Sequence, residues 1–500
     1  MELESGDFSE EKLSITNSVI NQGVNAHSNE DELINRAKEV ADEFKKVDES
    51  KTIRIISHLD ADGISAASIL IKTLNRCNRK YSISIVQQLT EEKIQALSKE
   101  RYKVFVFTDI GSGQVEFINK YLSDRRVFIL DHHELQSVIE NENITQLNPH
   151  LFGIDGNDGI SGSGVVYLFS REINIANRDM AHIAIIGAIG DVQEQNGFSK
   201  LNSMIVEDAK SSGKLKVING IRVFGAQTKP LYKLLQYSTD PYIPGVSGSE
   251  MGAINFLNKI GIKPRNSEGF VKLVNLSDEE IKKLTAGIIM QRISAGIKDA
   301  QSIIGPIYIL KEEKKESPLR DAREFATLLN ACGRLGEASI GIGTCLGDPK
   351  IKRKALDTLT TYKREIMNSL RWYDENKSNK KHIIKESKFL IINAEDKVKT
   401  SIIGTMSSIL SKSDSTSDIK FIIGLARNEE EPTTKVSIRC IDEELDARET
   451  MHKICADIYH ECGGHKSAAG AVIKSDEEEK FIDNAQKFLK RVFMEETIEK

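Results

Sequence analysis

Acidic and imidazole side chains follow the ends of several apolar stretches in the N-terminal part of the sequence. Asp131, His132 and His133 come directly after the apolar residues 127–130. In an open α/β sheet, side chains just past the carboxyl end of a strand line the ligand crevice. Carboxylate oxygen and imidazole nitrogen suit Mn²⁺, Mg²⁺ or Zn²⁺, so this stretch indicates a metal site. A polar surface loop is the alternative for this stretch taken alone.

His58, Asp60 and Asp62 follow a second apolar stretch, residues 53–57. Their alternate spacing places the three side chains on one side of an extended turn. Gly63 then lets the chain bend into the helix that we expect next.

Two further acids complete the pattern. Asp109 follows the apolar residues 104–107, and Asp191 follows residues 179–190, which are apolar on most sides and indicate a buried helix. Either acid alone is better explained as a helix cap or a turn residue. As a set, these carboxylates can converge at one edge of a sheet, where they would repel one another and raise their pKa values. Two divalent ions about 3.5–4 Å apart relieve such repulsion, and this is the usual arrangement for phosphate-ester hydrolysis.

Short strands that alternate with helices must position these groups. We expect strands over residues 53–57, 81–86, 104–107 and 127–130, and helices over residues 63–74, 90–98, 114–122, 162–173 and 179–190. Such alternation is typical of a mostly parallel sheet covered by helices, so the predicted fold class is α/β.

The chain divides into five expected parts. These are a mobile polar leader (1–27), a parallel-sheet domain with a leading helix (28–205), a helical connector or inserted domain (206–347), a long connecting helix (348–384) and a smaller α/β domain (385–500). In the last domain we expect strands over 389–393, 419–426 and 434–440, and helices over 399–410, 451–459, 467–471 and 476–493.

The composition is that of a soluble globular protein, with 39% hydrophobic and 29% charged residues. A net charge of −5 excludes a global basic field, so nucleic-acid binding must rest on local patches or metal ions. The six cysteines include no CxxC pair, which favours a reducing cytosol. No apolar run reaches the roughly 18 residues of a membrane span, and no signal peptide opens the sequence. We therefore expect a cytoplasmic protein without a membrane partner.

The metal-type stretches resemble, in order, the four motifs of the DHH phosphoesterase superfamily: His58-x-Asp60-Ala61-Asp62-Gly63, Asp109, Asp131-His132-His133 and Gly190-Asp191. Residues 463–470 resemble the glycine-rich motif of the companion DHHA1 domain. The combination, over about residues 51–475, resembles RecJ-type single-strand exonucleases. Residues 330–334 and 345–348 resemble the archaeal branch, whose members include partners of the replicative GINS complex.

This resemblance implies a catalytic DHH domain over residues 28–205 and a substrate-binding DHHA1 domain over residues 385–500. It implies two divalent ions, Mn²⁺ with Mg²⁺ as the substitute. One ion would take His58, Asp60 and Asp109, and the other Asp62, Asp109, His132 and Asp191, with Asp109 bridging the two.

The resemblance also implies catalytic roles for two neighbours of these ligands. His133 would face the scissile phosphate, and Asp131 either takes part in catalysis or orients a ligand imidazole. The sequence departs from bacterial RecJ at His58, where the bacterial enzymes usually carry an acid. This departure leaves the ligand set of the first ion open.

Substrate contacts are implied in both domains. Ser161 and Ser163 open a helix whose backbone amides could hold a phosphate or the chain near Asn148, although a plain flexible helix start explains them equally well. In the last domain, Arg439 matches a basic strand residue that contacts phosphate in the family. An Arg on a strand is otherwise more often only a surface residue.

The glycine-rich motif of the last domain offers further contacts. Gly463 and Gly464 allow a backbone to approach a phosphate closely, and His465 can donate a hydrogen bond to it. A zinc site formed by nearby Cys and His residues is disfavoured, because their spacing fits no common structural site. The basic face of the expected long helix is either a solvated surface or a groove for nucleic acid.

The sequence therefore predicts a metal-dependent exonuclease that hydrolyses single-stranded DNA or RNA, in replication or repair. Its expected partners are single-stranded nucleic acid and a replication protein such as GINS. Two alternatives stay open. One is a phosphodiesterase for short oligonucleotides or cyclic dinucleotides, whose relatives tend to be shorter. The other is a scaffold in a replication complex, against which the complete ligand set argues.

Overall fold

The computed structural model describes residues 28–498 except 239–240, 268, 414–415, 417, 430, 443–444 and 459. The expected leader over residues 1–27 lies outside these residues. The described chain forms two compact units. The first runs to Val217 and includes Tyr308–Glu312, and the second contains Ile218–Ile307 and the chain from Glu313 onward. None of the described helices is long and apolar enough to cross a lipid bilayer.

A five-stranded parallel sheet forms the centre of the first unit, in the order β2-β1-β3-β4-β5. The strands are β1 (Ile53–His58), β2 (Tyr81–Val86), β3 (Val104–Thr108), β4 (Arg126–Leu130) and β5 (Ile144–Leu147). The expected parallel sheet and its first four strands are confirmed. Strand β5 was not predicted from the sequence, because its four residues include the polar pair Thr145 and Gln146 and are too few to show a period.

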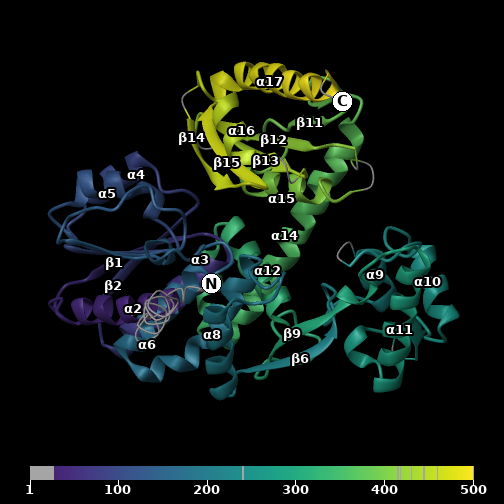
Figure 1. Cartoon of the computed structure of the whole chain (residues 1–500), viewed down its shortest axis with the longest axis horizontal. Coiled ribbons are helices and arrows are strands. Elements are labelled where there is room, and N and C mark those ends of the chain that lie inside the picture. The colour runs from purple at the N-terminus through teal and green to yellow at the C-terminus, as the bar shows by residue number, and fades with distance from the viewer. Residues whose placement is uncertain are drawn as a thin grey trace, which may run out of the picture. The chain divides into compact units, whose positions relative to one another are not determined.

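Helices cover both faces of this sheet (Figure 1). They are α2 (Asn29–Lys45), α3 (Ala61–Arg76), α4 (Glu91–Ser98), α5 (Val115–Leu122), α6 (Gly162–Ile173), α7 (Ala181–Gly190) and α8 (Lys200–Ser211). One apolar core joins α4 and α5 to Phe105 and Phe107 of β3. Helix α3 packs against α6 and α7, and α2 packs against α6. Phe44 of α2 contacts Phe128 of β4 edge-on, with ring centroids 5.3 Å apart.

A mainly helical region follows, and it contains a strand pair that the sequence analysis missed. Its elements are β6 (Leu215–Ile221), α9 (Leu231–Gln236), α10 (Glu250–Lys259), the hairpin of β7 (Arg265–Asn266) and β8 (Gly269–Phe270), α11 (Asp278–Ser294) and β9 (Ile304–Leu310). The N–H of Arg222 donates to Ile303 O, and the N–H of Lys311 donates to Lys214 O. The entering strand β6 and the leaving strand β9 are therefore antiparallel neighbours.

Three helices connect this region to the last domain. They are α12 (Ala322–Arg334), α13 (Ala338–Cys345) and α14 (Pro349–Asn376). The long helix expected within residues 348–384 is confirmed, and it ends at Asn376. Asp348 caps it by accepting hydrogen bonds from the N–H groups of Lys350 and Ile351.

The last domain is built on a six-stranded mixed sheet in the order β10-β11-β12-β13-β15-β14. The strands are β10 (Ile383–Lys385), β11 (Phe389–Asn393), β12 (Phe421–Arg427), β13 (Thr433–Cys440), β14 (His460–His465) and β15 (Ala468–Lys474), and the helices are α15 (Thr400–Leu410), α16 (Ala447–Ile454) and α17 (Glu478–Ile498). The α/β fold class is confirmed here too. The short helix expected over 467–471 is wrong, because these residues belong to a turn and to β15, which pairs with β13 and β14.

Candidate metal centre

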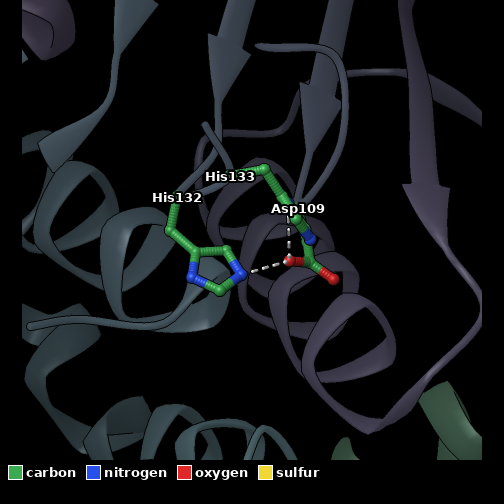
Figure 2. Close-up of side chains that lie close together, drawn as sticks. All are labelled: Asp109, His132 and His133. Carbon is green, nitrogen blue, oxygen red and sulfur yellow. Dashed lines mark ion pairs between the residues drawn. The ribbon is translucent and has the colours of Figure 1, made fainter. Parts of the chain in front are cut away.

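Asp109 is the residue on which the neighbouring imidazoles converge (Figure 2). It follows β3 and is 1% exposed. Its backbone is left-handed, with φ of 56°, which is uncommon for any residue except glycine. The Asp109 N–H donates to Leu130 O at the end of the adjacent strand β4, at 3.0 Å. Among the residues that the structure describes, no group gives either carboxylate oxygen of Asp109 a well-formed hydrogen bond.

His132 points one ring nitrogen at Asp109 and the other at a backbone carbonyl. Its Nε2 lies 3.3 Å from Asp109 Oδ1, and its Nδ1 lies 2.8 Å from Gly156 O. A carbonyl only accepts, so in the neutral ring the hydrogen lies on Nδ1 and the lone pair of Nε2 faces Asp109. A side chain at residue 156 would bring a Cβ within 1.8 Å of His132 O, so this close approach requires Gly156.

His133 is oriented by Asp131, which is completely buried. Asp131 Oδ1 accepts from His133 Nδ1 at 2.7 Å and from the N–H of His132 at 2.8 Å. Its Oδ2 accepts from the N–H of Ser112 at 2.9 Å. Both oxygens of Asp131 are thus engaged by donors of the protein, and the His133 ring is turned so that Nε2 points away from Asp131. Asp131 thus orients His133, whereas the orienting role expected for it concerned a ligand imidazole, and its part in catalysis stays a prediction.

Asp62 lies on the first turn of α3 and is held from α6 and α7. Its Oδ1 accepts from the N–H of Ser163 at 3.1 Å and also from the Ser163 hydroxyl. Its Oδ2 lies 3.9 Å from His132 Nε2 and has no hydrogen-bond donor within the described part of the chain. A Cβ at Gly187 would lie 2.4 Å from Asp62 Oδ1. Glycine at this position is therefore what lets α7 approach the carboxylate.

The remaining three expected ligands surround this pair. His58 Nδ1 lies 3.0 Å from Asp60 Oδ2 and 3.6 Å from Asp109 Oδ2. Asp60 also caps α3, because its Oδ1 accepts from the N–H of Gly63 at 2.9 Å. Asp191 Oδ2 lies 3.9 Å from His132 Nδ1, after the last residue of α7. The structure thus brings all six predicted ligands together.

The arrangement of donor atoms fits divalent ions. Three groups each hold three ligand atoms within 4.8 Å of one another: His58, Asp60 and Asp109; Asp62, His132 and Asp191; and Asp109, His132 and His133. The first two contain the same residues as the two expected ligand sets, apart from the second use of Asp109. The donors are carboxylate oxygen and imidazole nitrogen, which suit Mn²⁺ and Mg²⁺ better than soft ions. The unsatisfied oxygens of Asp62 and Asp109 are the strongest structural sign that this site takes a cation.

The pKa values in the cluster indicate crowded negative charge. Burial, and next the charge of Asp109, raises the pKa of Asp62 well above its usual value. Burial and the same charge raise the pKa of Asp191 to about 6. Burial alone would lower the pKa of His132, but Asp191 and Asp109 outweigh it and raise that pKa well above its usual value. A bound cation would supply the positive charge that protons supply here.

Several residues that support the site were not predicted from the sequence. Gln193 Nε2 donates to Asp191 Oδ2 at 3.0 Å and to Gly156 O at 2.9 Å, which joins two walls of the site. Asn148 donates to His133 O at 2.9 Å. Gln193 stands two residues after a predicted ligand, and Asn148 follows β5. Their positions directly after the ends of a helix and a strand are the sequence feature that could have indicated them.

The other predicted substrate residues of the first unit have internal partners. Ser161 caps α6 by accepting from the N–H of Gly164. Ser163 uses its N–H and its hydroxyl on Asp62, as described above. A Cβ at Gly162 would lie 2.4 Å from Asp109 Oδ1, so this turn passes directly beside the cluster. Whether the turn also contacts a phosphate stays a prediction.

Arg439 of β13 lies in the last domain beside a second arginine. Its guanidinium donates to Ser408 Oγ at 2.6 Å, Ser437 Oγ at 3.0 Å and Gly404 O at 3.2 Å. Burial, and next the charge of Arg334, lowers the pKa of Arg439 to about 10. These hydrogen-bond acceptors are all neutral, so a phosphate would be a favourable addition to this pair of cations.

The glycine-rich motif forms a hairpin at the edge of the same sheet. Gly463 of β14 pairs with Gly470 of β15, and Gly464 pairs with Ala469. Gly464 has φ of 141°, and a Cβ there would lie 2.4 Å from Ala468 O, so the hairpin requires glycine at this position. The side chain of His465 lies outside the described part of the structure.

Removal of one central carboxylate tests the metal site. For the wild-type protein we expect Mn²⁺ at about 100 times its Kd to stabilise the fold by about 2.7 kcal/mol, seen as a rise in Tm. Asp109→Asn should abolish this rise. Its Tm in EDTA should stay close to that of the wild type, because the substitution removes repulsion with Asp62 and Asp191 and also attraction to the neighbouring imidazoles. Asp124→Asn, at a side chain that is 69% exposed, is the control and should keep the full rise.

The same measurement has a predictable pH dependence. The pKa of Asp191 is raised to about 6 by burial, so this carboxyl is protonated at pH 5 and a metal must displace the proton. We expect the Mn²⁺-induced rise in Tm to be small at pH 5 and larger at pH 7. In EDTA the Asp191 carboxyl holds more protons in the folded state than in the unfolded state between about pH 4 and pH 6, so its own contribution to stability should fall as pH rises through this window. Equal Mn²⁺ effects at both pH values would contradict the prediction.

Comparisons with known proteins agree with this geometry. Three family models match the chain: the N-terminal domain of the DHH family (residues 52–188), the DHH-CID domain (223–303) and the DHHA1 domain (386–491). An uncharacterized protein of Methanocaldococcus jannaschii is 34% identical over 449 residues, which cover 88% of this chain and 92% of that protein.

Three solved structures are similar over nearly the whole chain at low identity. RecJ of Thermus thermophilus in complex with Mn²⁺ is 15% identical with a TM-score of 0.56, and the match covers 92% of this chain and 55% of that one. An exonuclease RecJ bound to manganese is 16% identical with a TM-score of 0.54, with 92% and 94% covered. CDC45 of Entamoeba histolytica is 12% identical with a TM-score of 0.60, with 95% and 98% covered.

This chain thus spans about half the length of Thermus RecJ, and these likenesses bear on the fold. The family models, the long match to the Methanocaldococcus protein and the acid and imidazole cluster lead to one assignment. The chain belongs to the DHH/DHHA1 phosphoesterase superfamily, and its fold is similar to that of RecJ.

Proposed function

We propose that this protein is a divalent-metal-dependent exonuclease that hydrolyses phosphodiester bonds of single-stranded DNA or RNA. The observation that carries this proposal is the pair of buried carboxylates, Asp62 and Asp109. Three of their four oxygens have no well-formed hydrogen bond from any residue that the structure describes, and His132 Nε2 faces both groups. Two RecJ proteins of similar fold bind manganese, which supports Mn²⁺ as the ion, with Mg²⁺ as the alternative.

Most residues of the cluster would serve as metal ligands, and one, His133, would contact the phosphate of the substrate. His58, Asp60 and Asp109 would hold one ion, and a second would take the remaining ligands with Asp109 shared. When bound, two such ions lower the pKa of a water and offset the charge that develops on the phosphate.

His133 lies beside this set. Burial would lower its pKa, but the charge of Asp131 outweighs burial and raises it. A protonated His133 would donate a hydrogen bond to a phosphate oxygen of the substrate. Asp131 would keep the ring charged and oriented, which is a positioning role.

Strand binding would be shared with the last domain. The adjacent cations Arg439 and Arg334 support a phosphate contact there, and the backbone at Gly463 and Gly464 supports a second one. We also propose GINS or another replication protein as a partner, on the resemblance of residues 330–334 to the archaeal branch. Co-elution of the two purified components would test this pairing.

The central test uses end-labelled DNA and RNA single strands. With Mn²⁺ we expect stepwise shortening of the strands, and with EDTA no product. Asp62→Asn should reduce the rate by more than the roughly 10–100-fold that is typical when a residue that only hydrogen-bonds a metal ligand is removed. The control Asp124→Asn should cleave like the wild type. Wild-type activity in Asp62→Asn would exclude the proposed metal site, and turnover of dinucleotides alone would favour the oligonucleotide phosphodiesterase.

Asp131→Asn separates a positioning acid from a ligand. We expect cleavage to fall by about 10–100-fold, because His133 loses the charge that keeps it protonated. The Mn²⁺-induced rise in Tm should remain, since both oxygens of Asp131 are occupied by donors of the protein. The pH profile of the residual activity should shift toward lower pH. Loss of the Mn²⁺ effect in this variant would show instead that Asp131 is a ligand.

A further inference from the structure

Aromatic and basic side chains alternate on the surface of the region between Ile218 and Ile307. Lys229 Nζ lies 5.0 Å from the ring centroid of Phe224 and 5.5 Å from that of Tyr237. Lys233 Nζ lies 5.7 Å from the Tyr237 ring and 5.4 Å from the Tyr232 ring. These contacts link the five side chains into a continuous row.

The row continues from α9 to the hairpin of β7 and β8. The rings of Tyr232 and Phe270 have centroids 5.2 Å apart and are tilted by 46°. Arg265 then places its guanidinium 5.2 Å from the Phe270 centroid. We call the six residues from Phe224 to Phe270 the aromatic–cation series, in the contact order Phe224, Lys229, Tyr237, Lys233, Tyr232 and Phe270.

Three rings of the series are open to solvent. Phe224 is 43% exposed, Tyr237 58% and Phe270 50%, and none of them belongs to the apolar core of the region. That core contains Leu231, Leu234 and other aliphatic side chains, mainly of α9, α10 and α11. These three helices group together in Figure 1. Folding therefore does not account for these rings, and an exposed group of large apolar side chains indicates a binding surface.

The charge of the region favours an anionic partner. Residues 218–307 contain eleven Lys and Arg residues against seven Asp and Glu residues, whereas the whole chain has a net charge of −5. Glu250 pairs with Lys233 at the side of the series. The region as a whole is therefore net basic within an acidic chain, which favours an anionic partner.

Lys229 is held in a position that suits a phosphate. Its side-chain stem packs over Gly225, where a Cβ would lie 2.6 Å from Lys229 Cδ. Burial, and next the charge of Lys363 on α14, lowers the pKa of Lys229, while Glu324 opposes this effect. Glu324 is itself engaged by the N–H of Gln227 and the hydroxyl of Thr228. An anion near Lys229 and Lys363 would relieve their mutual repulsion.

We propose that the aromatic–cation series binds a single-stranded nucleic acid, with bases stacked on its exposed rings and phosphates held by its lysines. Aromatic platforms interleaved with cations are the usual means of binding single strands without sequence preference. A duplex does not offer its bases for such stacking. Protein interfaces are depleted in Lys, so two lysines within the row argue against a protein as the occupant.

This inference rests on the proposed function for the identity of the strand, which would be the substrate of the nuclease. The series would then be a second contact for strands long enough to reach it. Short substrates such as dinucleotides would not use it.

Binding by the full-length protein in EDTA tests the series without turnover. The probe is a fluorescein-labelled oligothymidylate or oligouridylate of about 20 nucleotides, followed by anisotropy. The double variant Tyr237→Leu/Phe270→Leu keeps apolar side chains but removes the flat rings. We expect its affinity to fall by at least about tenfold, because stacking contributes roughly fivefold to 150-fold per base.

Matched variants make the result specific to stacking. Tyr237→Phe keeps the ring and should bind like the wild type. Met290→Ala, at a residue of α11 that is 60% exposed and lies outside the series, should also bind normally. All variants should keep the wild-type Tm and the wild-type rate on a dinucleotide in Mn²⁺. Affinity of the double Leu variant within about twofold of the wild type would overturn the proposal and leave the surface to a protein partner.

The two proposals fail in different ways. If the wild type binds strands through these rings but cleaves none with Mn²⁺, the hydrolytic function is wrong and the series stands. If strands are cleaved and the double Leu variant binds and cleaves them normally, the hydrolytic function stands and the series is wrong.

Discussion

Asp62 and Asp109 place two carboxylates in an interior that solvates charge poorly. The surrounding residues must therefore offset the free-energy cost of burying this negative charge. Three imidazoles lie within 4.0 Å of the Asp109 carboxylate, from His58, His132 and His133. Ser163 donates to one oxygen of Asp62 and leaves the other unsatisfied. The protein thus offsets part of the negative charge and reserves the rest for cations. A fold without a cation at this point would gain nothing from keeping the acids so close.

The six candidate ligands could be identified from the sequence because most of them stand directly after an apolar stretch. The parallel sheet could be predicted from short apolar stretches that alternate with helices. Every candidate ligand except Asp191 lies at the carboxyl end of a strand or within the few residues after it. The contact between Ser163 and Asp62 could not be predicted, because the two residues are separated by 101 positions and meet only through the packing of α3 on α6. The requirement for glycine at position 187 could not be predicted either, because it depends on how closely α7 approaches Asp62.

The elements that could not be predicted from the sequence are those that form only against partners distant along the chain. The residues at 467–471 are mostly small and show no period of their own, and they become part of β15 because β13 and β14 lie on either side. The strands β6 and β9 pair across more than eighty residues, so neither stretch reveals its partner. The local sequence was sufficient to predict an element whose cap and periodicity lie within its own residues, such as helix α14 with its cap at Asp348.

The pairing of β6 with β9 has a further consequence for the origin of the chain. Because Arg222 and Ile303 are hydrogen-bonded neighbours, the segment between them begins and ends at one place. Such a segment can be gained or lost as a cassette while the host chain keeps its path, since closing the gap needs only a short turn. Relatives with the same catalytic sheet and no such cassette would differ in length but not in topology. Substitutions in this segment, which carries the exposed rings and lysines, can then accumulate independently of substitutions in the acids that surround Asp109.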